Sequence, residues 1–553
     1  MSVEKLIVDH METWTSALQT RSTAGRGSSG KIDLYGIKKL RELILELAVR
    51  GKLVPQDPND EPASDLLKRI AAEKAELVKQ GKIKKQKPLP EISEEEKPFE
   101  LPEGWEWVHL PDIYCSISES SRKIKSSEIL PEGKYPVIKQ SQEFISGYCN
   151  NECLLIKLNN PVIVFGDHTR NIKFIDFDFV VGADGVKILS PILICERFFF
   201  WQLRSFKLDV RGYARHFKVL NSCLFALPPI AEQERIVEKV SSLMSLCDQL
   251  EQQSLTSLDA HQQLVETLLG TLTDSQNTAE LAENWARISE HFDTLFTTEA
   301  SVDALKQTIL QLAVMGKLVP QDPNDEPASE LLKRIAQEKA QLVKEGKIKK
   351  QKPLPPISDE EKPFELPEGW EWCRIGNIVN IKSELVSPKD YLNLYQVAPD
   401  IIEKGTGRVI SKRTVKESGV KGPNSRFYKG QIVYSKIRPS LSKVFLAEYN
   451  GLCSADMYPL DCYINPNYLL KYILSIPFLM QVKKAENRIK MPKLNSDSFY
   501  NIIVAIPPYN EQQAIFDKIN SIEAVCNGLI SYIGIYHKTQ LHLADALTDA
   551  AIN

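Results

Sequence analysis

A long internal repeat constrains this sequence more than any other feature. The block GKLVPQDPNDEPAS at Gly51–Ser64 recurs unchanged at Gly316–Ser329, and the match continues to Trp107 and Trp372. At an offset of 265, only six of the 57 positions differ. Because the two blocks are nearly identical in sequence, each is expected to form the same supersecondary unit. We therefore expect a duplicated fold with an internal pseudo-twofold relation.

A second repeated block lies at a different offset. The pattern Ala-(Leu/Ile)-Pro-Pro followed by Glu-Gln occurs at Ala226–Gln233 and again at Ala505–Gln512, an offset of 279. The 14 residues by which the two offsets differ fall within residues 108–226 and 373–504, which share little sequence. We call these segments the first and second variable domains. Each half thus consists of a helical entry, a linker, a variable domain and a long helix.

Each Pro-Pro motif opens a predicted long helix. Proline is tolerated at a helix start because its missing N–H has no partner there. Apolar residues then alternate at spacings of four and three, which is typical of a coiled-coil seam. The seam residues are Ile236, Val240, Leu243, Cys247 and Leu250, then Ile515, Ile519, Ile522, Cys526 and Leu529. We predict that they pack helix on helix and bind no cofactor. Shorter amphipathic helices are expected at Leu40–Val49 and Leu305–Val314.

The linker in each repeat is rich in proline and lysine. The prolines, which favour an extended chain, are Pro88, Pro90, Pro98 and Pro102. The lysines, which are able to contact phosphates, are Lys82, Lys84, Lys85 and Lys87. A solvated charge run balanced by Glu94–Glu96 is the favoured interpretation of these lysines. Residues Arg21–Gly30 (RSTAGRGSSG) have no counterpart in the second half, and we expect a mobile loop there.

The variable domains read as mixed α and β. Short β-branched or aromatic runs bounded by turn residues predict strands. They are Val162–Gly166, Phe177–Val181, Val186–Leu189, Gln431–Ile437 and Lys443–Tyr449, the last two joined by a turn or loop of sequence RPSLS. One helix is expected in each domain, at Phe198–Phe206 and at Tyr468–Phe478.

Charge is unevenly distributed along the chain. The net charge is −3, yet residues 108–226 hold 15 Lys and Arg against 12 Asp and Glu. Residues 373–500 hold 20 against 10, so the remaining residues carry a net charge of −16. Two basic domains in an acidic frame suit a polyanionic ligand.

Sequence signatures of catalysis are missing. There is no GxxxxGK[ST], GxGxxG after a strand, HExxH or GxSxG. Pro507-Pro508-Tyr509 resembles the end of the (Asn/Asp)-Pro-Pro-Tyr motif of adenine methyltransferases, but Ile506 stands where the Asn or Asp is needed. The ten cysteines are scattered, and Cys149/Cys153 without a second pair indicates free thiols, so we expect no metal site. No apolar run of 18 residues and no signal-peptide pattern occur, which predicts a cytoplasmic protein without membrane contact.

LPEGWEW leads into two unlike basic domains, at Leu101 and Leu366, and PPxxEQ opens a long helix after each. In this paired arrangement, over nearly its whole length, the chain resembles the specificity subunit of Type I restriction–modification systems. The resemblance implies an α+β fold, with two target-recognition domains separated by two long helices that form an antiparallel coiled coil. Each domain would read one half of a split double-stranded DNA sequence.

The resemblance also implies partners and the absence of catalysis on this chain. Two modification subunits would dock on the helices, carry S-adenosylmethionine and methylate adenine. Restriction subunits would add cleavage driven by ATP with Mg²⁺, and no cofactor would sit on this chain. Two alternatives remain open from the residues: a single-chain methyltransferase or nuclease, and a coiled-coil scaffold whose variable domains bind protein.

The predicted organisation has seven segments. They are 1–50 (amino-terminal helical region), 51–107 (first repeat and linker), 108–226 (first variable domain), 227–315 (central helical region), 316–372 (second repeat and linker), 373–504 (second variable domain) and 505–553 (carboxyl-terminal helix). Unlike readers on a rigid helical spacer predict an asymmetric target with unread bases between its halves.

Candidate DNA contacts are the polar and basic clusters of the variable domains, because bases and phosphates are bound by Arg, Lys, Asn, Gln and hydroxyl groups. In the first domain they are Lys139, Gln140, Gln142, His168, Thr169, Arg170, Asn171, Lys173, Arg211, Tyr213, Arg215, His216 and Lys218. In the second they are Tyr395, Gln396, Lys436, Arg438, Ser440, Lys443, Arg488, Lys490 and Lys493. For each single residue, a solvated loop charge is the alternative.

Overall fold

The chain forms two compact units that share two long helices. The computed structural model describes residues 3–21, 31–117, 123–182, 185–208, 215–486 and 492–552. Unit 1 comprises Met1–Ser257 and Tyr536–Asn553, and unit 2 comprises Leu258–Ile535. Helix α7 (Ile230–Asp274) begins in unit 1 and ends in unit 2, whereas α17 (Tyr509–Ile552) begins in unit 2 and ends in unit 1. Each unit therefore holds one variable domain, one copy of the repeat and part of each long helix.

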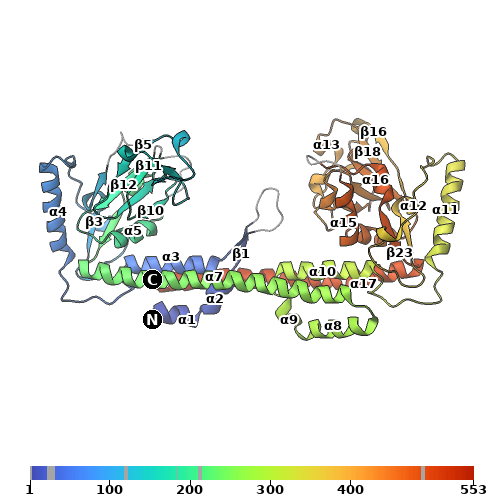
Figure 1. Ribbon diagram of the computed structural model, residues 1–553, viewed down its shortest axis with the longest axis horizontal. Helices are drawn as coiled ribbons and strands as arrows, with labels where there is room; N and C mark the ends of the chain where they lie inside the picture. Colours follow the sequence, from blue (N-terminus) through green and yellow to red (C-terminus); the bar gives the residue numbers. More distant parts are fainter. Residues whose placement is uncertain are drawn as a thin grey trace. The chain divides into compact units, whose positions relative to one another are not determined.

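Unit 1 opens with helices and continues into the first variable domain (Figure 1). Its helices are α1 (Val3–Asp9), α2 (Met11–Ser16), α3 (Tyr35–Val49), α4 (Ala63–Lys79), α5 (Glu196–Ser205) and α6 (Phe217–Leu220). Its strands are β1 (Gln19–Arg21), β2 (Lys31–Asp33), β3 (Glu106–His109), β4 (Tyr114–Ile117), β5 (Lys123–Ile124), β6 (Tyr135–Ile138), β7 (Tyr148–Cys149), β8 (Leu155–Ile156), β9 (Val162–Gly166), β10 (Ile172–Ile175), β11 (Phe179–Gly182), β12 (Val186–Pro191) and β13 (Leu224–Leu227).

Unit 2 repeats this order. Its helices are α8 (Thr278–Glu290), α9 (Phe292–Leu295), α10 (Glu299–Val314), α11 (Ala328–Lys344), α12 (Ile375–Ile378), α13 (Val415–Ser418), α14 (Pro466–Ile473), α15 (Ile476–Ala485) and α16 (Ser496–Asn501). Its strands are β14 (Glu371–Arg374), β15 (Val379–Ile381), β16 (Glu384–Val386), β17 (Tyr395–Val397), β18 (Asn424–Phe427), β19 (Ile432–Ser435), β20 (Val444–Leu446), β21 (Gly451–Ser454), β22 (Met457–Cys462) and β23 (Ile503–Ile506).

The two variable domains have one antiparallel sheet of the same topology although their sequences differ. The first contains an antiparallel sheet of order β10-β9-β12-β4, and the second contains β20-β19-β22-β15. In both sheets the edge strand that comes first in the sequence, β4 or β15, pairs with a later strand, β12 or β22. That later strand pairs in turn with one strand of a hairpin, β9-β10 or β19-β20. A second sheet in each domain includes a parallel pair, β6 with β11 and β17 with β21. Mixed sheets with helices establish the α+β class expected from the sequence.

Each variable domain is closed at its base by a short two-stranded ribbon. Strand β3, which begins at the last two residues of the EGWEW motif, pairs antiparallel with β13, and β14 pairs with β23 in the same way. The chain therefore enters and leaves each domain side by side. Gly51 and Gly316 terminate the preceding helices with φ of +66° and +71°. A Cβ on either glycine would lie 2.4 Å from the ring of Pro102 or Pro367, so both the backbone conformation and the close packing require glycine here.

The seam residues of the long helices are buried in the pattern that their spacing predicts. Ile236, Val240, Leu243, Cys247 and Leu250 are at most 8% exposed. In unit 2, Cys526 belongs to a helical cluster with Val265 and Leu269 of α7 and Ile309 of α10, and Ile522 and Leu529 pack against it. Ile515 and Ile519 instead belong to a cluster with Tyr468 and Tyr472 of the second variable domain. Both tyrosines lie on helix α14, and the same cluster includes Leu310 and Val314 of α10, so the start of α17 also packs against helices, one of which belongs to the second variable domain.

Two shorter helices complete the helical layer in each unit. In unit 1, Arg41 of α3 forms ion pairs with Asp248 and Glu251 of α7, at 2.6 Å each. The same helix donates from the Tyr35 hydroxyl to Asp545 of α17 at 2.7 Å. In unit 2, α10 occupies the equivalent position, and its Leu305, Ile309 and Leu312 join the helical cluster. The amphipathic helices expected at Leu40–Val49 and Leu305–Val314 are thus confirmed, with earlier starts.

The structure differs from the sequence-based expectation in two further places. Helices α4 and α11, within the repeat, were not predicted, because only Ala63, Leu66 and Ile70 of α4 are buried and the rest is polar. The single helix expected over Tyr468–Phe478 is instead two, α14 and α15, which break at Ser475 before Pro477. Helix α14 cannot continue through Pro477, because proline lacks the N–H that a helix interior needs and its ring clashes with the preceding turn. Proline is tolerated in the first turn of α15, where that N–H has no partner.

Several other expectations have simple outcomes. In the linkers, the described chain is extended apart from one short 3₁₀ turn in each, at Glu94–Glu96 and Asp359–Glu361. The loop predicted at Arg21–Gly30 follows β1, which pairs with β2, and residues 22–30 lie outside the described residues. Cys149 is buried and Cys153 exposed, both as free thiols. No helix of the described residues is long and apolar enough to cross a membrane.

Candidate nucleic-acid interface

The two clearest candidate loops occupy the same place in the two variable domains. Residues 167–171 connect β9 to β10, and residues 436–443 connect β19 to β20. We call them the tip loops. Each contains an arginine with left-handed backbone, Arg170 at φ +61° and Arg438 at φ +45°. Such a conformation costs a non-glycine residue of order 1–3 kcal/mol and is concentrated at functional sites. The structure therefore brings two clusters that share no sequence to one topological position, each with a strained arginine.

In the first domain, Gln140 joins the first tip loop to the loop that follows β6. Its backbone oxygen accepts hydrogen bonds from the Thr169 hydroxyl at 2.5 Å and from Asn171 Nδ2 at 2.8 Å. Its side-chain oxygen accepts from the His168 backbone N–H at 3.1 Å. Gln142, in the same loop, is exposed, as is Thr169. Candidates from two segments that are distant in the sequence are thus held side by side by hydrogen bonds.

Lys173 has an internal role in this arrangement. The side chain is buried, and Nζ donates to the backbone oxygens of Lys139, Glu143 and Phe144 at 2.8, 2.5 and 3.3 Å. These bonds use all three donors of the ammonium group. Burial lowers the pKa of Lys173. The residue therefore holds the loop after β6 in position and presents no free donor.

His216 is also internal. It is 1% exposed, and its Nδ1 and backbone N–H contact the backbone oxygen of Asp167 at 3.1 and 2.8 Å. The Asp167 carboxylate accepts from the Phe217 N–H at 2.9 Å. These bonds tie the segment before α6 to the first tip loop, while its neighbours Arg215 and Lys218 remain exposed. Arg211 and Tyr213 lie outside the described residues.

In the second domain, two of the predicted clusters are joined. The backbone N–H of Arg438 donates to Pro492 at 2.9 Å, and that of Leu494 donates to Lys436 at 2.9 Å. Lys436 and Lys493 share Asp456, at 3.9 and 3.2 Å. Arg438 is exposed, and its guanidinium has no partner among the described residues. Arg488 and Lys490, from the same segment as Lys493, lie outside the described residues.

The remaining second-domain candidates divide into inner and outer residues. Gln396 is 3% exposed, accepts from Arg413 Nε at 3.1 Å and donates to Asn424 at 3.3 Å. Lys443 donates to the backbone oxygen of Pro399. Ser440 is half-buried, and its backbone N–H donates to Glu486.

Tyr395 is the outer aromatic candidate of this domain. It is 39% exposed and packs edge-on against Tyr449, with ring centroids 5.1 Å apart. The Lys412 ammonium lies 6.0 Å from the Tyr395 ring. An exposed aromatic ring beside a cation remains available to a ligand.

Sequence reasoning missed the residues that fix each variable domain on its long helix. Glu232 is buried, and its carboxylate accepts from the Trp105 indole N–H at 2.9 Å and from Gln56 Nε2 at 3.1 Å. In unit 2, Glu511 accepts from Trp370 at 2.9 Å and from Gln321 at 3.2 Å. We call each trio a neck clamp. Burial raises the pKa of both carboxyl groups. The signal was present in the sequence, since all three residues recur in both halves.

The glutamine of each Glu-Gln pair performs a matching function. Gln233 accepts from the backbone N–H of Cys195 at 2.9 Å, and Gln512 accepts from that of Asn465 at 2.9 Å. Cys195 and Asn465 immediately precede α5 and α14. The Glu-Gln motif, interpreted from sequence as a helix start, therefore also holds the domain's own helix and its linker.

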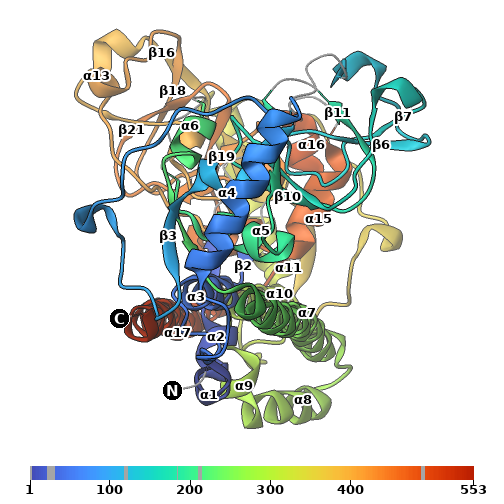
Figure 2. The same cartoon turned by 90° about the vertical axis from the view of Figure 1, so that its left-hand side faces the viewer.

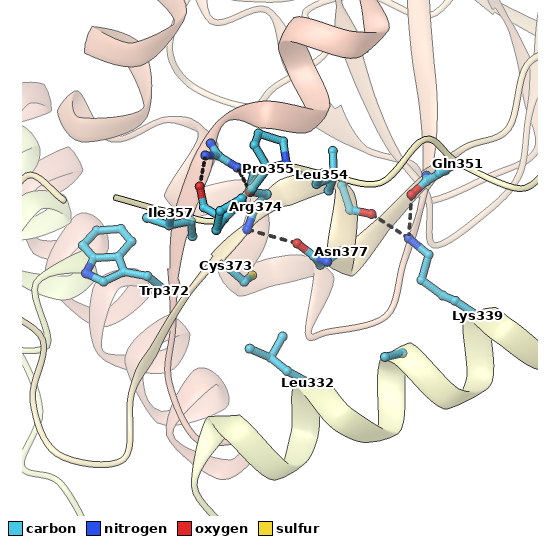
Figure 3. A pocket seen from close by; sticks show the side chains of 13 residues that line it. Leu332, Lys339, Gln351, Leu354, Pro355, Ile357, Trp372, Cys373, Arg374 and Asn377 are labelled. Atoms are coloured by element: carbon cyan, nitrogen blue, oxygen red, sulfur yellow. Dashed lines mark hydrogen bonds between the residues drawn. The ribbon is translucent and has the colours of Figure 1, made fainter. Parts of the chain in front are cut away.

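A groove beside each domain is occupied by a lysine that acts as a strut. Figure 3 shows Lys339 reaching from α11 towards the linker and the second variable domain, where Nζ donates to Gly376 at 2.6 Å, Val379 at 2.9 Å and Gln351 at 3.4 Å. Burial lowers the pKa of Lys339 to about 8. Lys74 makes the equivalent bonds in unit 1, to Pro111 at 2.6 Å and Gln86 at 2.8 Å. In each unit the lysine thus connects the repeat helix to the linker and to the variable domain.

Comparison with known proteins decides the family. The family model of the Type I restriction modification DNA specificity domain matches residues 102–260 and 367–533. Each match begins just before a variable domain and includes it. The Type I restriction enzyme EcoAI specificity subunit of Escherichia coli is 51% identical over the full length of both chains. The chain belongs to the Type I restriction specificity subunits. The EcoEI specificity subunit of the same organism is 49% identical, again over both full lengths.

Among solved structures, the HsdS subunit from Thermoanaerobacter tengcongensis matches at 16% identity and a TM-score of 0.37. The match covers 83% of this chain and 98% of that one. As a Type I specificity subunit with two specificity domains, the chain is the DNA-recognition component of a restriction–modification system. The resemblance stated from the sequence is thus confirmed. The tip loops belong to the two domains that carry this recognition.

Proposed function

We propose that this specificity subunit reads an asymmetric, bipartite double-stranded DNA sequence, one half-site per variable domain, with unread bases between. The observation that carries the proposal is the pair of tip loops, which share a position in the sheet but no sequence. Equivalent loops present different side chains to the same kind of surface. Two readers built in this way recognise different half-sites, whereas identical loops would give a palindrome.

We assign direct DNA contact to candidates whose polar atoms reach the surface. In the first domain these are Gln142, Thr169, Arg215 and Lys218, and in the second Tyr395, Arg438, Ser440 and Lys493. Arg170 and Lys436 are half-buried and donate to the backbone oxygens of Leu208 and Ala455, both at 2.8 Å, so they join the positioning residues. Lys139, Gln140, His168, Asn171, Lys173, His216, Gln396 and Lys443 are assigned to positioning, since each holds neighbouring loop backbone or side chains, or lies inside. Arg211, Tyr213, Arg488 and Lys490 remain candidates from sequence alone. Arg438 is the strongest single candidate because its guanidinium is exposed and unpaired among the described residues.

We further propose that the chain itself is not catalytic. Two modification subunits would carry S-adenosylmethionine and methylate adenine within the target, and restriction subunits would supply ATP- and Mg²⁺-dependent cleavage. The lack of a glycine-rich cofactor loop and of the Asn or Asp before Pro507-Pro508 supports this division. Because DNA is the substrate of the complex, we place the protein in the cytoplasm.

Exposed apolar residues on α17 support the docking of modification subunits. Val525 and Tyr532, in the part of α17 that belongs to unit 2, are 65% and 67% exposed. Their spacing of seven places them on one helix face, the arrangement that packs against a partner helix. Large apolar side chains exposed on one face mark an interaction surface.

One assay tests the proposed division of labour. The purified chain is mixed with DNA and S-adenosylmethionine, with and without the modification subunit of its system. We expect adenine methylation only when the modification subunit is present, with sequence preference supplied by this chain. Methylation by the chain alone would favour a single-chain enzyme. Absence of DNA binding even with the modification subunit would favour a protein-binding scaffold.

A further inference from the structure

Each copy of the repeat carries an exposed run of lysines directly after α4 or α11. The residues are Lys82, Lys84, Lys85 and Lys87, and their counterparts Lys347, Lys349, Lys350 and Lys352. We call the two segments, 82–87 and 347–352, the lysine loops. We propose that they bind DNA phosphates outside the half-sites, independently of sequence. This inference rests on the proposed DNA-reading function and adds a second, separate set of contacts to it.

Four linker carboxylates bond to residues other than these lysines. Glu94 pairs with Lys97 at 2.5 Å, and Glu96 accepts from the backbone N–H and hydroxyl of Ser93 at 2.9 and 3.0 Å. In unit 2, Asp359 pairs with Lys362 at 2.6 Å and Glu361 with Arg374 at 3.0 Å. The first-loop lysines are exposed, as a solvated charge run requires, and neither Glu94 nor Glu96 forms an ion pair with them.

Most of the loop lysines are left without an ion pair. None of the four in the first loop has one among the described residues. In the second loop, Lys347 pairs with Glu345 at 2.8 Å and Lys352 with Asp497 at 3.1 Å, and the latter pair is well exposed on both sides. Lys349 and Lys350 have no partner within the described part of the chain. Each loop therefore keeps at least two free ammonium groups.

The fold holds the first loop near the part of the variable domain that lies away from the long helix. Figures 1 and 2 both show α4 rising from the level of α3 along the first variable domain, towards the end of that domain where β11 lies. Lys74 connects the end of the loop to the variable domain by donating to Gln86 at 2.8 Å and to the backbone oxygen of Pro111 at 2.6 Å. Lys339 and Gln351 form the equivalent contact at 3.4 Å in unit 2. A loop positioned before it meets its ligand loses less freedom on binding.

The repeat itself indicates a ligand common to both halves. None of the six positions at which the two copies differ is buried in either helix or linker, so the surface of this block tolerates change. Neither lysine loop contains a difference. Phosphate contacts carry no sequence information, so identical loops can serve two readers of different sequence. Lysine suits this role as a compact point charge. The neighbouring variable domains, with net charges of +3 (15 basic against 12 acidic residues) and +10 (20 against 10), favour DNA over an acidic protein as the ligand.

The test removes the four lysines that are unpaired in both halves. The variant Lys84→Gln/Lys85→Gln/Lys349→Gln/Lys350→Gln is assembled with its modification subunits and compared with wild type. A matched control, Lys68→Gln/Lys79→Gln/Lys333→Gln/Lys344→Gln, removes the same charge from exposed positions of α4 and α11. Binding to a fluorescent 40-base-pair duplex of arbitrary sequence, a length of about four helical turns, is followed by anisotropy over a series of salt concentrations.

The slope of log binding constant against log salt concentration is negative, and we expect its magnitude in the loop variant to fall by about 0.9 for each phosphate that is no longer bound. The total reduction should be roughly 2 to 4 units, and the slope of the control should equal that of wild type within error. Variants of one loop alone should each show about half of this reduction. An unchanged slope would overturn the proposal. So would dissociation of modification subunits from the complex with the slope unaltered, because the loops would then bind protein.

The same variants separate this inference from the proposed function. Against a duplex containing the target, identified from the methylated adenines, the loop variant should bind more weakly but keep the wild-type ratio of target to arbitrary DNA. A wild-type complex with no preference for that target would refute the proposed function, and a reduced slope in the loop variant would still support the lysine loops. A changed ratio in the loop variant would overturn the claim that the contact ignores sequence.

Discussion

The neck clamp of unit 2 makes a quantitative prediction. Each carboxylate oxygen of Glu511 accepts one hydrogen bond, a buried one from Trp370 at 2.9 Å and a partly buried one from Gln321 at 3.2 Å. Glu511→Gln replaces one oxygen by an NH₂ group that faces a donor, and a buried donor without an acceptor costs about 1–3 kcal/mol. Trp370→Phe removes the indole N–H from the same bond at a similar cost. The double variant should cost less than the sum, with a coupling of about 1 kcal/mol.

Urea unfolding of the two single variants and the double variant measures this coupling. The other half of the chain provides a matched control, because Glu232 binds Trp105 and Gln56 and shares no partner with Trp370. Glu232→Gln combined with Trp370→Phe should therefore be additive within about 0.5 kcal/mol. Equal coupling in both cycles, or additivity in both, would refute the clamp as the device that holds the linker to the helix.

Two further predictions concern single residues. Arg438→Gly should stabilise the protein by about 1 kcal/mol in urea unfolding, because glycine accepts the left-handed backbone, and should weaken DNA binding in the reconstituted complex; unchanged binding would exclude Arg438 from the interface. For Lys339, the folded pKa of about 8 lies below the ordinary 10.5, so the buried ammonium costs the folded state most below pH 8, and this cost shrinks as pH rises to 10.5. The unfolding free energy of wild type relative to Lys339→Met should therefore rise by about 2 kcal/mol between pH 7.5 and 10.5, after allowance for partial exposure, and a flat difference would contradict the strut.

The frame of the molecule was predictable because its signals are local and repeated. Pro228-Pro229 before a four-three apolar pattern fixed the start and course of α7, and the same pattern located α17. Helix α4 escaped notice because its apolar face is only three residues wide, and most of it is solvated. The partner of Ile515 and Ile519 was also beyond the sequence, since periodicity gives the buried face of a helix but not what covers it.

The candidate interface was predictable as clusters but not as contacts. Composition located both tip loops, although nothing in their letters showed that they occupy equivalent turns. Lys173 and Gln396 have the residue types of DNA contacts, yet one holds three backbone oxygens and the other lies among Arg413 and Asn424. The backbone oxygens that hold Lys173 belong to residues about 30 or more positions away in the sequence. Short-range sequence patterns do not show such contacts.

The central claim is that each variable domain reads its own half-site on a common frame. It is tested most directly by replacing Val108–Phe225 with the corresponding segment of another Type I specificity subunit and sequencing the methylated adenines in a host that carries the full system. The segment is bounded by the β3–β13 ribbon, so the neck clamp and the long helices are retained. We expect one half of the recognised sequence to change, while the other half and the spacer length stay as in wild type. A change in both halves would contradict the account.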